Sequence, residues 1–258
     1  MDVALALVLH DPSGRLISQL DRTWPGLAAH FDAIAVQVSM QTAAPLLERL
    51  TDHGVHLGRE SADAATNIGR VRRHALALAL QLDRPHLIYC DFDRLLHWFE
   101  YHPRELIDVA ARIRQHDFTV LGRTPRAFGT HPRLQRDTEA IINHVYARVS
   151  GRPWDTGAGA RGLSRRAAQT IVAHSVDDTL GNDVSWPLLL QHAGDFTLDY
   201  IETEGLEFET ADRFPDEVMA AGGLPEWIDQ LDDDPAHWAM RLDLARVEVT
   251  AMIPFARS

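Results

Sequence analysis

The chain has 258 residues, of which 45% are apolar and 24% are charged, and its net charge at neutral pH is −12. These values are typical of a globular protein with one large or two small domains, and the negative charge argues against nucleic acid or an anionic membrane surface as the main partner. The single cysteine, Cys90, excludes an internal disulfide framework and a cysteine-based zinc site, and no apolar stretch approaches the roughly 18 residues that cross a bilayer.

The first half of the chain alternates predicted strands and helices. The apolar run at Val3–Leu9 has no basic region before it and a polar turn after it, so it indicates a first strand rather than a signal peptide, and we expect a cytoplasmic protein. Further strands are predicted over 33–39, 55–57 and 86–90, and helices over 15–31 (interrupted at 24–26), 43–53 and 67–82. This order predicts an α/β fold with a mostly parallel central sheet and helices on both faces.

The second half continues with helices and fewer strands. Helices are predicted over 103–115, over 134–149, from Ser164 onward, over 184–192 and over 235–253, and strands over 118–122 and 196–202. Residues 203–223 are acidic and contain glycine, which indicates a surface loop. No repeat or linker divides the chain, so a single domain is expected over 1–258, with the oligomeric state open and a homo-oligomer among the alternatives.

Two carboxylates, Asp91 and Asp93, follow the buried strand that ends at Cys90. If the strand continues, both side chains point to the same side, and they lie at the carboxyl edge of the sheet, where α/β proteins bind ligands. Two like charges so close together repel, and a divalent cation resolves the conflict because hard cations prefer carboxylate oxygens. The alternative is that both aspartates cap the next helix and lie in water.

Arginines precede this acidic strand on the predicted helix over 67–82. Arg70 and Arg73 lie on neighbouring turns, where guanidinium groups could clamp a pyrophosphate or pair with the aspartates. A solvated helix face is the simpler alternative.

Together these segments resemble the GT-A glycosyltransferases. The resemblance begins with Gly69, Arg73, His74 and Ala75, followed by LIYCDFD over 87–93, with His74 where asparagine is usual and Arg72 where a small residue is usual. It continues with the glycine-rich DTGAGARGLSRRAAQTI over 155–171, which contains an Arg-Arg pair, and with GNDVSWPLLLQHAG over 181–194. It covers the chain in patches from about residue 3 to about residue 200, through order and spacing rather than any one motif.

The resemblance implies a fold, a cofactor and partners. A GT-A fold would divide the domain into a nucleotide-binding half over 1–123, an acceptor-side half over 124–223 and a C-terminal helical extension over 224–258. Asp93 would bind Mn²⁺ or Mg²⁺ on the diphosphate of a nucleotide-sugar donor, and Asp91 would contact the ribose or the metal. His10, Asp11 and Arg59 would lie near the nucleotide. The acceptor would be a small molecule or a glycan with a free hydroxyl group.

Asp183 is the candidate catalytic residue on the acceptor side. If the enzyme inverts the anomeric centre, this carboxylate would take the acceptor proton as general base. If the enzyme retains it, the residue would position the sugar or the acceptor. A plain N-cap of the helix that follows is the structural alternative, and it is compatible with either role.

One feature of the family is missing from the sequence. Many GT-A enzymes supply a third metal ligand late in the chain, often a histidine, but the segment YIETEGLEFETADRF over 200–214 contains none. Glu204, Glu207 or Glu209 could substitute, or waters and the nucleotide could complete the coordination.

Two alternatives come from other classes. The first is a non-catalytic nucleotide- or sugar-binding relative of the same fold, which the missing histidine favours. The second is a phosphatase of the haloacid-dehalogenase type, in which the first aspartate is a nucleophile. That family has its motif on an early strand and uses a late lysine, whereas this chain contains no lysine.

Overall fold

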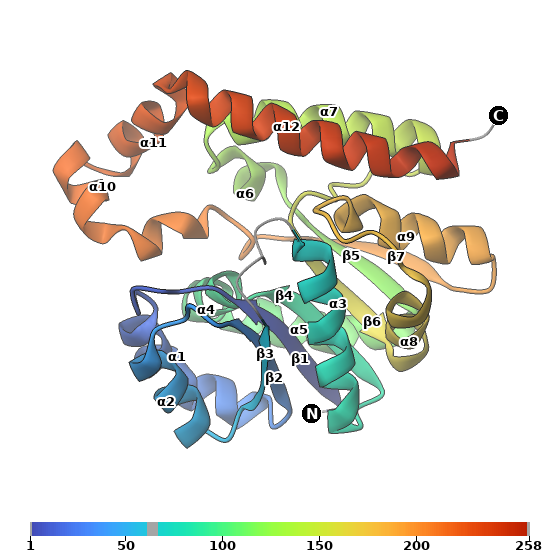
Figure 1. Ribbon diagram of the computed structural model, residues 1–258, viewed down its shortest axis with the longest axis horizontal. Coiled ribbons are helices and arrows are strands. Elements are labelled where there is room, and N and C mark those ends of the chain that lie inside the picture. The colour runs from blue at the N-terminus through green and yellow to red at the C-terminus, as the bar shows by residue number, and fades with distance from the viewer. Residues whose placement is uncertain (1, 61–66, 257–258) are drawn as a thin grey trace.

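The computed structural model describes residues 2–60 and 67–256, which form one seven-stranded sheet with helices on both faces (Figure 1). The strand order is β3-β2-β1-β4-β6-β5-β7. Neighbouring strands are parallel except at β6, which is antiparallel to both β4 and β5. The strands are β1 (Val3–Leu9), β2 (Ile34–Ser39), β3 (His56–Glu60), β4 (His86–Asp91), β5 (Phe118–Arg123), β6 (Ala160–Ser164) and β7 (Leu198–Thr203).

Successive residues of the central strands pack alternately into two apolar layers, one on each face of the sheet, because side chains alternate across a strand. In β1, Leu5 and Leu7 pack into one layer while Ala4 and Ala6 pack into the other. The first layer is covered by α1 (Ile17–His30), α2 (Ala44–Asp52), α4 (Phe92–Tyr101) and α5 (Pro103–Arg112). The second is covered by α3 (Ile68–Ala79), α8 (Arg165–His174) and α9 (Asn182–Ala193).

A third apolar cluster joins the C-terminal helix to the body. The helices α7 (Arg133–Ser150) and α12 (Pro235–Met252) lie side by side, and Tyr146, Leu188 and Met252 bury the contact of both with α9 (Figure 1). The remaining helices are α6 (Pro125–Gly129), α10 (Pro215–Ala221) and α11 (Leu224–Asp233), with 3-10 turns η2 (Leu80–Leu82), η3 (Ile113–Gln115), η4 (Glu209–Arg213) and η5 (Ile253–Phe255).

The predicted fold class is confirmed: the domain is α/β, its sheet is mostly parallel, and helices cover both faces. Two local expectations are wrong, and one helix is missing from the predicted elements. The helix α1 is continuous and contains Pro25 instead of breaking there. The segment 203–223 is not a plain surface loop, because it buries Leu206 and Phe208 and forms η4 and α10. The helix α4 was not expected, although Leu95 and Phe99 have helical spacing and are both buried.

The helix α4 changes the geometry of the acidic pair. Because α4 begins at Phe92, the chain is not extended through Asp93, and the expectation that both carboxylates project from one strand is wrong. Asp91 is the last residue of β4, while Asp93 lies in the first turn of α4.

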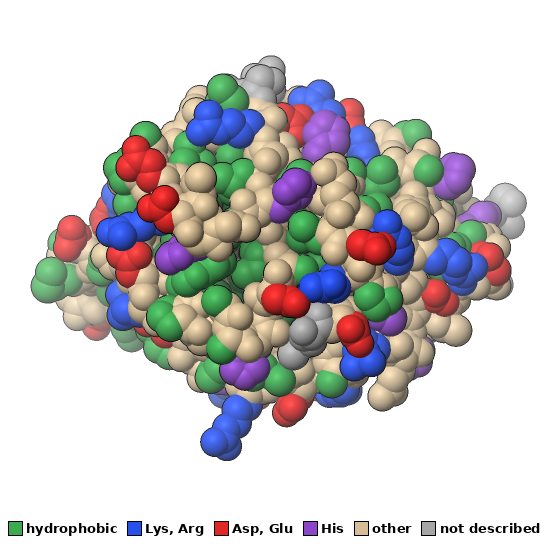
Figure 2. All heavy atoms as spheres, turned by 90° about the horizontal axis from the view of Figure 1, so that it is seen from below, with side chains coloured by type: hydrophobic (Ala, Val, Ile, Leu, Met, Phe, Trp, Pro, Cys, Tyr) green, Lys and Arg blue, Asp and Glu red, His purple; other side chains and the backbone are tan. Residues whose placement is uncertain are grey.

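The surface carries both signs of charge. On the face seen in Figure 2, acidic and basic side chains are interspersed, without a large area of one sign. Within residues 2–60 and 67–256, none of the helices combines the length and the apolar character that a membrane span requires.

Candidate functional site

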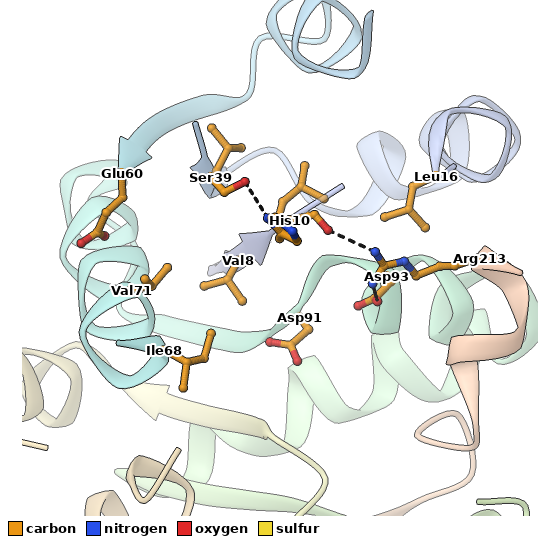
Figure 3. A pocket seen from close by; sticks show the side chains of 12 residues that line it. Val8, His10, Leu16, Ser39, Glu60, Ile68, Val71, Asp91, Asp93 and Arg213 are labelled. Carbon is orange, nitrogen blue, oxygen red and sulfur yellow. Dashed lines mark hydrogen bonds and ion pairs between the residues drawn. The ribbon is translucent and has the colours of Figure 1, made fainter. Parts of the chain in front are cut away.

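A pocket opens at the carboxyl ends of β1, β2 and β4, the edge where parallel sheets bind ligands (Figure 3). Its volume is about 690 Å³, including the open solvent at its mouth. The lining residues are Val8, Leu9, His10, Leu16, Val38, Ser39, Glu60, Ile68, Val71, Asp91, Asp93 and Arg213. Half of these residues are aliphatic and half are polar or charged, so the pocket combines an apolar wall with ionisable groups.

Asp91 and Asp93 both line this pocket, as Figure 3 shows. Asp91 accepts a hydrogen bond from the Tyr89 hydroxyl at 3.2 Å, and its other oxygen lies 3.7 Å from Nη2 of Arg72. Asp93 accepts the Arg94 backbone N–H at 2.9 Å through Oδ1, while Oδ2 lies 3.1 Å from Nη1 of Arg213.

Negative charge accumulates around Asp93. Burial, together with the nearby carboxylates of Glu209 and Asp91, raises the pKa of its carboxyl group to about 6, although Arg213 and Arg94 act to lower it. Because these surroundings disfavour the charged form of Asp93, an additional cation beside it would stabilise its carboxylate. The donor set, two carboxylates at one edge of a pocket, fits a hard divalent cation such as Mg²⁺ or Mn²⁺.

Of the two polar residues after β1, one lines the pocket and the other does not. His10 faces the pocket, and its Nδ1 lies 2.8 Å from the hydroxyl of Ser39 at the end of β2. Asp11 is only 1% exposed, and its Oδ2 accepts the Leu16 backbone N–H at 2.9 Å. Asp11 therefore shapes the turn into α1 instead of reaching a ligand, and its predicted place beside the nucleotide does not follow from the structure.

The three arginines predicted to contact the donor lie outside the pocket lining. Arg70 pairs with Glu60 at 2.9 Å, and Arg73 bonds to Asp178 and to the carbonyl oxygen of Asp177. Arg59 is exposed on β3. Of the three arginines, Arg70 is the one that contacts a lining residue of the pocket, because its partner Glu60 lines it.

Asp183 lies in the first turn of α9 and is 4% exposed. It is not the N-cap, which is Gly181. One of its oxygens lies 2.9 Å from Nη1 of Arg72, and the other lies 3.4 Å from Nη2 of Arg161. Its carboxylate is therefore paired with two buried arginines rather than exposed to a substrate.

Arg72 connects the two acidic regions of the site. Its guanidinium lies 3.7 Å from Asp91 and 2.9 Å from Asp183, and it also donates to the side-chain oxygen of Asn182 at 3.1 Å. Although burial alone would lower its pKa, the charge of Asp183 and its other partners raises the pKa well above the ordinary value. Arg72 is thus a permanent cation between the pocket and α9.

Sequence reasoning missed most of the arginines of the site. Arg72 was noted only as a departure from the family pattern, although an arginine on the apolar face of a helix signals a buried partner. Arg94 binds Glu209 at 2.7 Å in the same way. Arg161 lies in the glycine-rich segment, and Arg213 lies in the acidic segment after β7. No local sequence signal distinguishes Arg213 from a surface arginine.

The sequence and the fold of the chain can be compared with those of known proteins. No protein-family model matches the sequence, and a search of the curated proteins also finds no match. Among solved structures, glucosyl-3-phosphoglycerate synthase from Mycobacterium tuberculosis in complex with UDP matches with a TM-score of 0.50 and 12% identity, covering 88% of this chain and 79% of that one. The chain has a GT-A-like fold.

Further solved structures match this GT-A-like fold less well. The same synthase in complex with Mn²⁺, UDP-glucose and phosphoglyceric acid matches with a TM-score of 0.49 and 13% identity, covering 87% of this chain and 79% of that one. A cytidylyltransferase from Leptospira borgpetersenii matches with a TM-score of 0.46 and 10% identity, covering 92% and 96% of the two chains.

The GT-A-like fold raises the question of a third metal ligand. All three late glutamates are paired elsewhere: Glu204 bonds to Arg126, Glu207 to Arg126 and His102, and Glu209 to Arg94. Within the part of the chain that the structure describes, no three histidine, cysteine or acidic side chains are grouped closely enough to hold a metal ion. A cation at Asp91 and Asp93 would therefore take its other ligands from the donor and from water.

Proposed function

We propose that this protein is a glycosyltransferase that moves a sugar from a nucleotide-diphosphate donor to an acceptor hydroxyl group, with a divalent cation at Asp91 and Asp93. The observation that carries the proposal is the pocket at the carboxyl ends of β1, β2 and β4 in a GT-A-like sheet, with both carboxylates on its wall. The synthase of similar fold was solved with UDP, which supports a nucleotide as the ligand. Because the fold is GT-A-like, the phosphatase alternative is dropped.

The pocket suits the nucleoside end of such a donor. Val8, Leu9 and Val38 offer an aliphatic surface for a nucleobase, and polar side chains line the rest of the pocket. His10 and Ser39 supply hydrogen-bonding atoms that are already fixed against each other at 2.8 Å. The nucleotide therefore meets a largely preformed site.

The diphosphate end would meet the cation. Mn²⁺ or Mg²⁺ supplies positive charge that stabilises the departing nucleoside diphosphate. The chain holds the two carboxylates for it, since the Tyr89 hydroxyl orients Asp91 and the Arg94 backbone N–H orients Asp93.

In this proposal, Arg70 and Arg73 contact other protein groups instead of the donor. Arg70 holds Glu60 at the pocket wall, and Arg73 ties α3 to residues 177–178 of the loop before α9. Arg59, next to Glu60 in β3, remains exposed to approach by the donor.

Asp183 is proposed as a positioning residue. Its pairing with Arg72 and Arg161 argues against the general-base role, because a general base needs a lone pair that faces the acceptor. The group that Asp183 would position is Arg72, and not the sugar or acceptor expected from the sequence. Asp183 fixes Arg72, and Arg72 in turn lies beside Asp91. The same observation supports a second candidate, a nucleotide- or sugar-binding relative without turnover, because the site then has no exposed base at this position.

The first experiment is a thermal-shift panel of UDP, GDP, ADP and their common sugar conjugates, each with Mn²⁺ and with EDTA. A ligand that binds only the folded state adds about 2.7 kcal/mol of stability at 100 times its dissociation constant. A shift that depends on one nucleoside diphosphate and vanishes with EDTA supports the proposal. The absence of any shift contradicts it.

Sugar release then separates the two candidates. The nucleotide-sugar that gives a shift is incubated with the protein, and free sugar and nucleoside diphosphate are measured by chromatography. Turnover supports the transferase, and binding without turnover supports the binding protein. For Asp183→Asn, we expect weaker Mn²⁺-dependent donor binding together with a loss of kcat, since the displaced Arg72 no longer orients Asp91.

A further inference from the structure

Arg213 is the one guanidinium among the described residues that line the pocket. It belongs to η4, far along the chain from the strands that form the pocket. Nη1 lies 3.1 Å from Oδ2 of Asp93, and Nη2 donates to the carbonyl oxygen of His10 at 3.2 Å, as the dashed lines in Figure 3 show. A cation of the protein therefore already occupies the carboxylate proposed to bind a metal ion.

The two oxygens of Asp93 are both engaged. Oδ1 accepts the Arg94 backbone N–H, and Oδ2 faces Arg213. A divalent cation on Oδ2 would lie beside the guanidinium, and two cations at that separation repel. Metal binding at Asp93 therefore competes with Arg213.

The backbone at Arg213 is held in place, so the side chain alone has to move. Arg15 donates to the Arg213 carbonyl oxygen at 2.9 Å. The preceding residue, Asp212, accepts hydrogen bonds from His97 at 2.7 Å and from Gln19 at 2.8 Å.

The guanidinium of Arg213 is also incompletely satisfied. Its Nε is buried and has no hydrogen-bond partner in the structure, so one donor is still available to an acceptor. Phosphate oxygens suit a guanidinium because several N–H groups in one plane can bind them together.

We propose that the Arg213 side chain is a switch that exchanges one partner for another. While the pocket is free of ligand, Arg213 pairs with Asp93. When the donor binds, the divalent cation takes the place of Arg213 at Asp93, and the guanidinium of Arg213 binds the diphosphate of the donor. This inference rests on the proposed function. It makes the binding of cation and diphosphate cooperative, because the diphosphate removes the competitor of the cation. It also assigns Arg213 to specificity for a diphosphate over an uncharged nucleoside.

The test measures Mn²⁺ affinity by electron paramagnetic resonance of free Mn²⁺, without nucleotide, on protein stripped with EDTA. The Arg213→Gln variant should bind Mn²⁺ about tenfold more tightly than the wild type, because a charge-assisted contact to Asp93 no longer has to be broken. Arg213→Lys keeps a competing charge and should stay within about threefold of the wild type. The matched control is Arg166→Gln, which removes an equal charge from a pair with Asp117 and Asp195.

A second arm adds inorganic pyrophosphate as the probe for the diphosphate. It should tighten Mn²⁺ binding in the wild type and do so less in Arg213→Gln, beyond the effect of pyrophosphate on Mn²⁺ in solution. Circular dichroism checks that each variant is folded, and Arg213→Met, which also removes the charge, serves if the glutamine variant is not.

The outcomes separate this inference from the proposed function. The switch is overturned if folded Arg213→Gln binds Mn²⁺ no more tightly than the wild type. It is also overturned if Arg213→Lys binds Mn²⁺ about tenfold more tightly than the wild type. If Asp93→Asn binds Mn²⁺ as the wild type does, the metal site itself is refuted. Loss of Mn²⁺ binding in Asp93→Asn with no change in Arg213→Gln leaves the metal site standing and removes the switch.

Discussion

Replacement of Arg72 by methionine tests whether burial, rather than distance, sets the strength of the ion pairs in this site. Nη1 of Arg72 lies 2.9 Å from Oδ2 of Asp183, and the two side chains are 5% and 6% exposed. At this distance two unit charges attract by about 6 kcal/mol at an effective dielectric constant of about 20. Desolvation offsets part of this gain in the wild type, but the variant leaves Asp183 buried beside Arg161, 3.4 Å away. We expect Arg72→Met to lower the free energy of unfolding by about 3–5 kcal/mol.

The same helix supplies a matched control. Arg70 lies 2.9 Å from Glu60, the same distance as in the buried pair, but its side chain is 35% exposed, against 10% for Glu60. Glu60 would keep a second partner in the variant, because Nδ1 of His74 lies 2.8 Å from its other oxygen. Because Arg70 is partly solvated and Glu60 keeps His74, Arg70→Met should cost about 1 kcal/mol, near the upper end for solvent-accessible ion pairs. Urea denaturation followed by circular dichroism measures both variants, and an unchanged slope m shows that the denatured states are comparable.

A double-mutant cycle assigns the loss to the pair itself. Arg72→Met combined with Asp183→Asn should be less destabilised than the sum of the single variants by about 1–3 kcal/mol, because the two residues are in contact. Additive effects would refute the coupling. A loss for Arg72→Met no larger than that for Arg70→Met would refute the argument that burial decides.

Three further predictions concern pH and packing. The pKa of His97 is raised, because hydrogen bonds to Asp212 and Glu207 overcome the lowering effect of burial, so its stabilising contribution is complete below the ordinary value of about 6.5 and is lost as the pH rises through the raised pKa. Urea titrations from pH 5 to 9 should show this loss in the wild type and not in His97→Gln. Burial, then Asp183, raises the pKa of Glu248 on α12 well above its usual range, so Glu248→Gln should be more stable than the wild type at pH 7, with the difference vanishing below about pH 4; equal stability at both pH values would contradict it. In Gly69→Ala, the new Cβ would lie 2.5 Å from the carbonyl oxygen of Asp177, so we expect a loss of about 1–3 kcal/mol in urea denaturation, and wild-type stability would show that the loop yields.

The sequence by itself determined the α/β class and the place of Asp91 at the carboxyl end of β4. The strand and helix periodicities are local properties, so the order of the elements follows from residues that are close together in the chain. The carboxyl ends of parallel strands meet at one edge, which is why the sequence alone places Asp91 and His10 at the same edge of the sheet. Both line the pocket.

Only the tertiary structure decided what the charged residues contact. Arg213 pairs with Asp93 across 120 residues of chain, and Arg72 bonds to Asn182 across 110. Such pairings depend on how distant elements cross, so a sequence pattern can indicate a buried arginine, as at Arg72, but not the partner that it takes. The start of α4 at Phe92 likewise turned Asp93 out of the strand direction. Burial then decided the chemistry, because a buried arginine must find a carboxylate or a carbonyl oxygen, and the partners it takes determine which acidic groups remain available to a ligand.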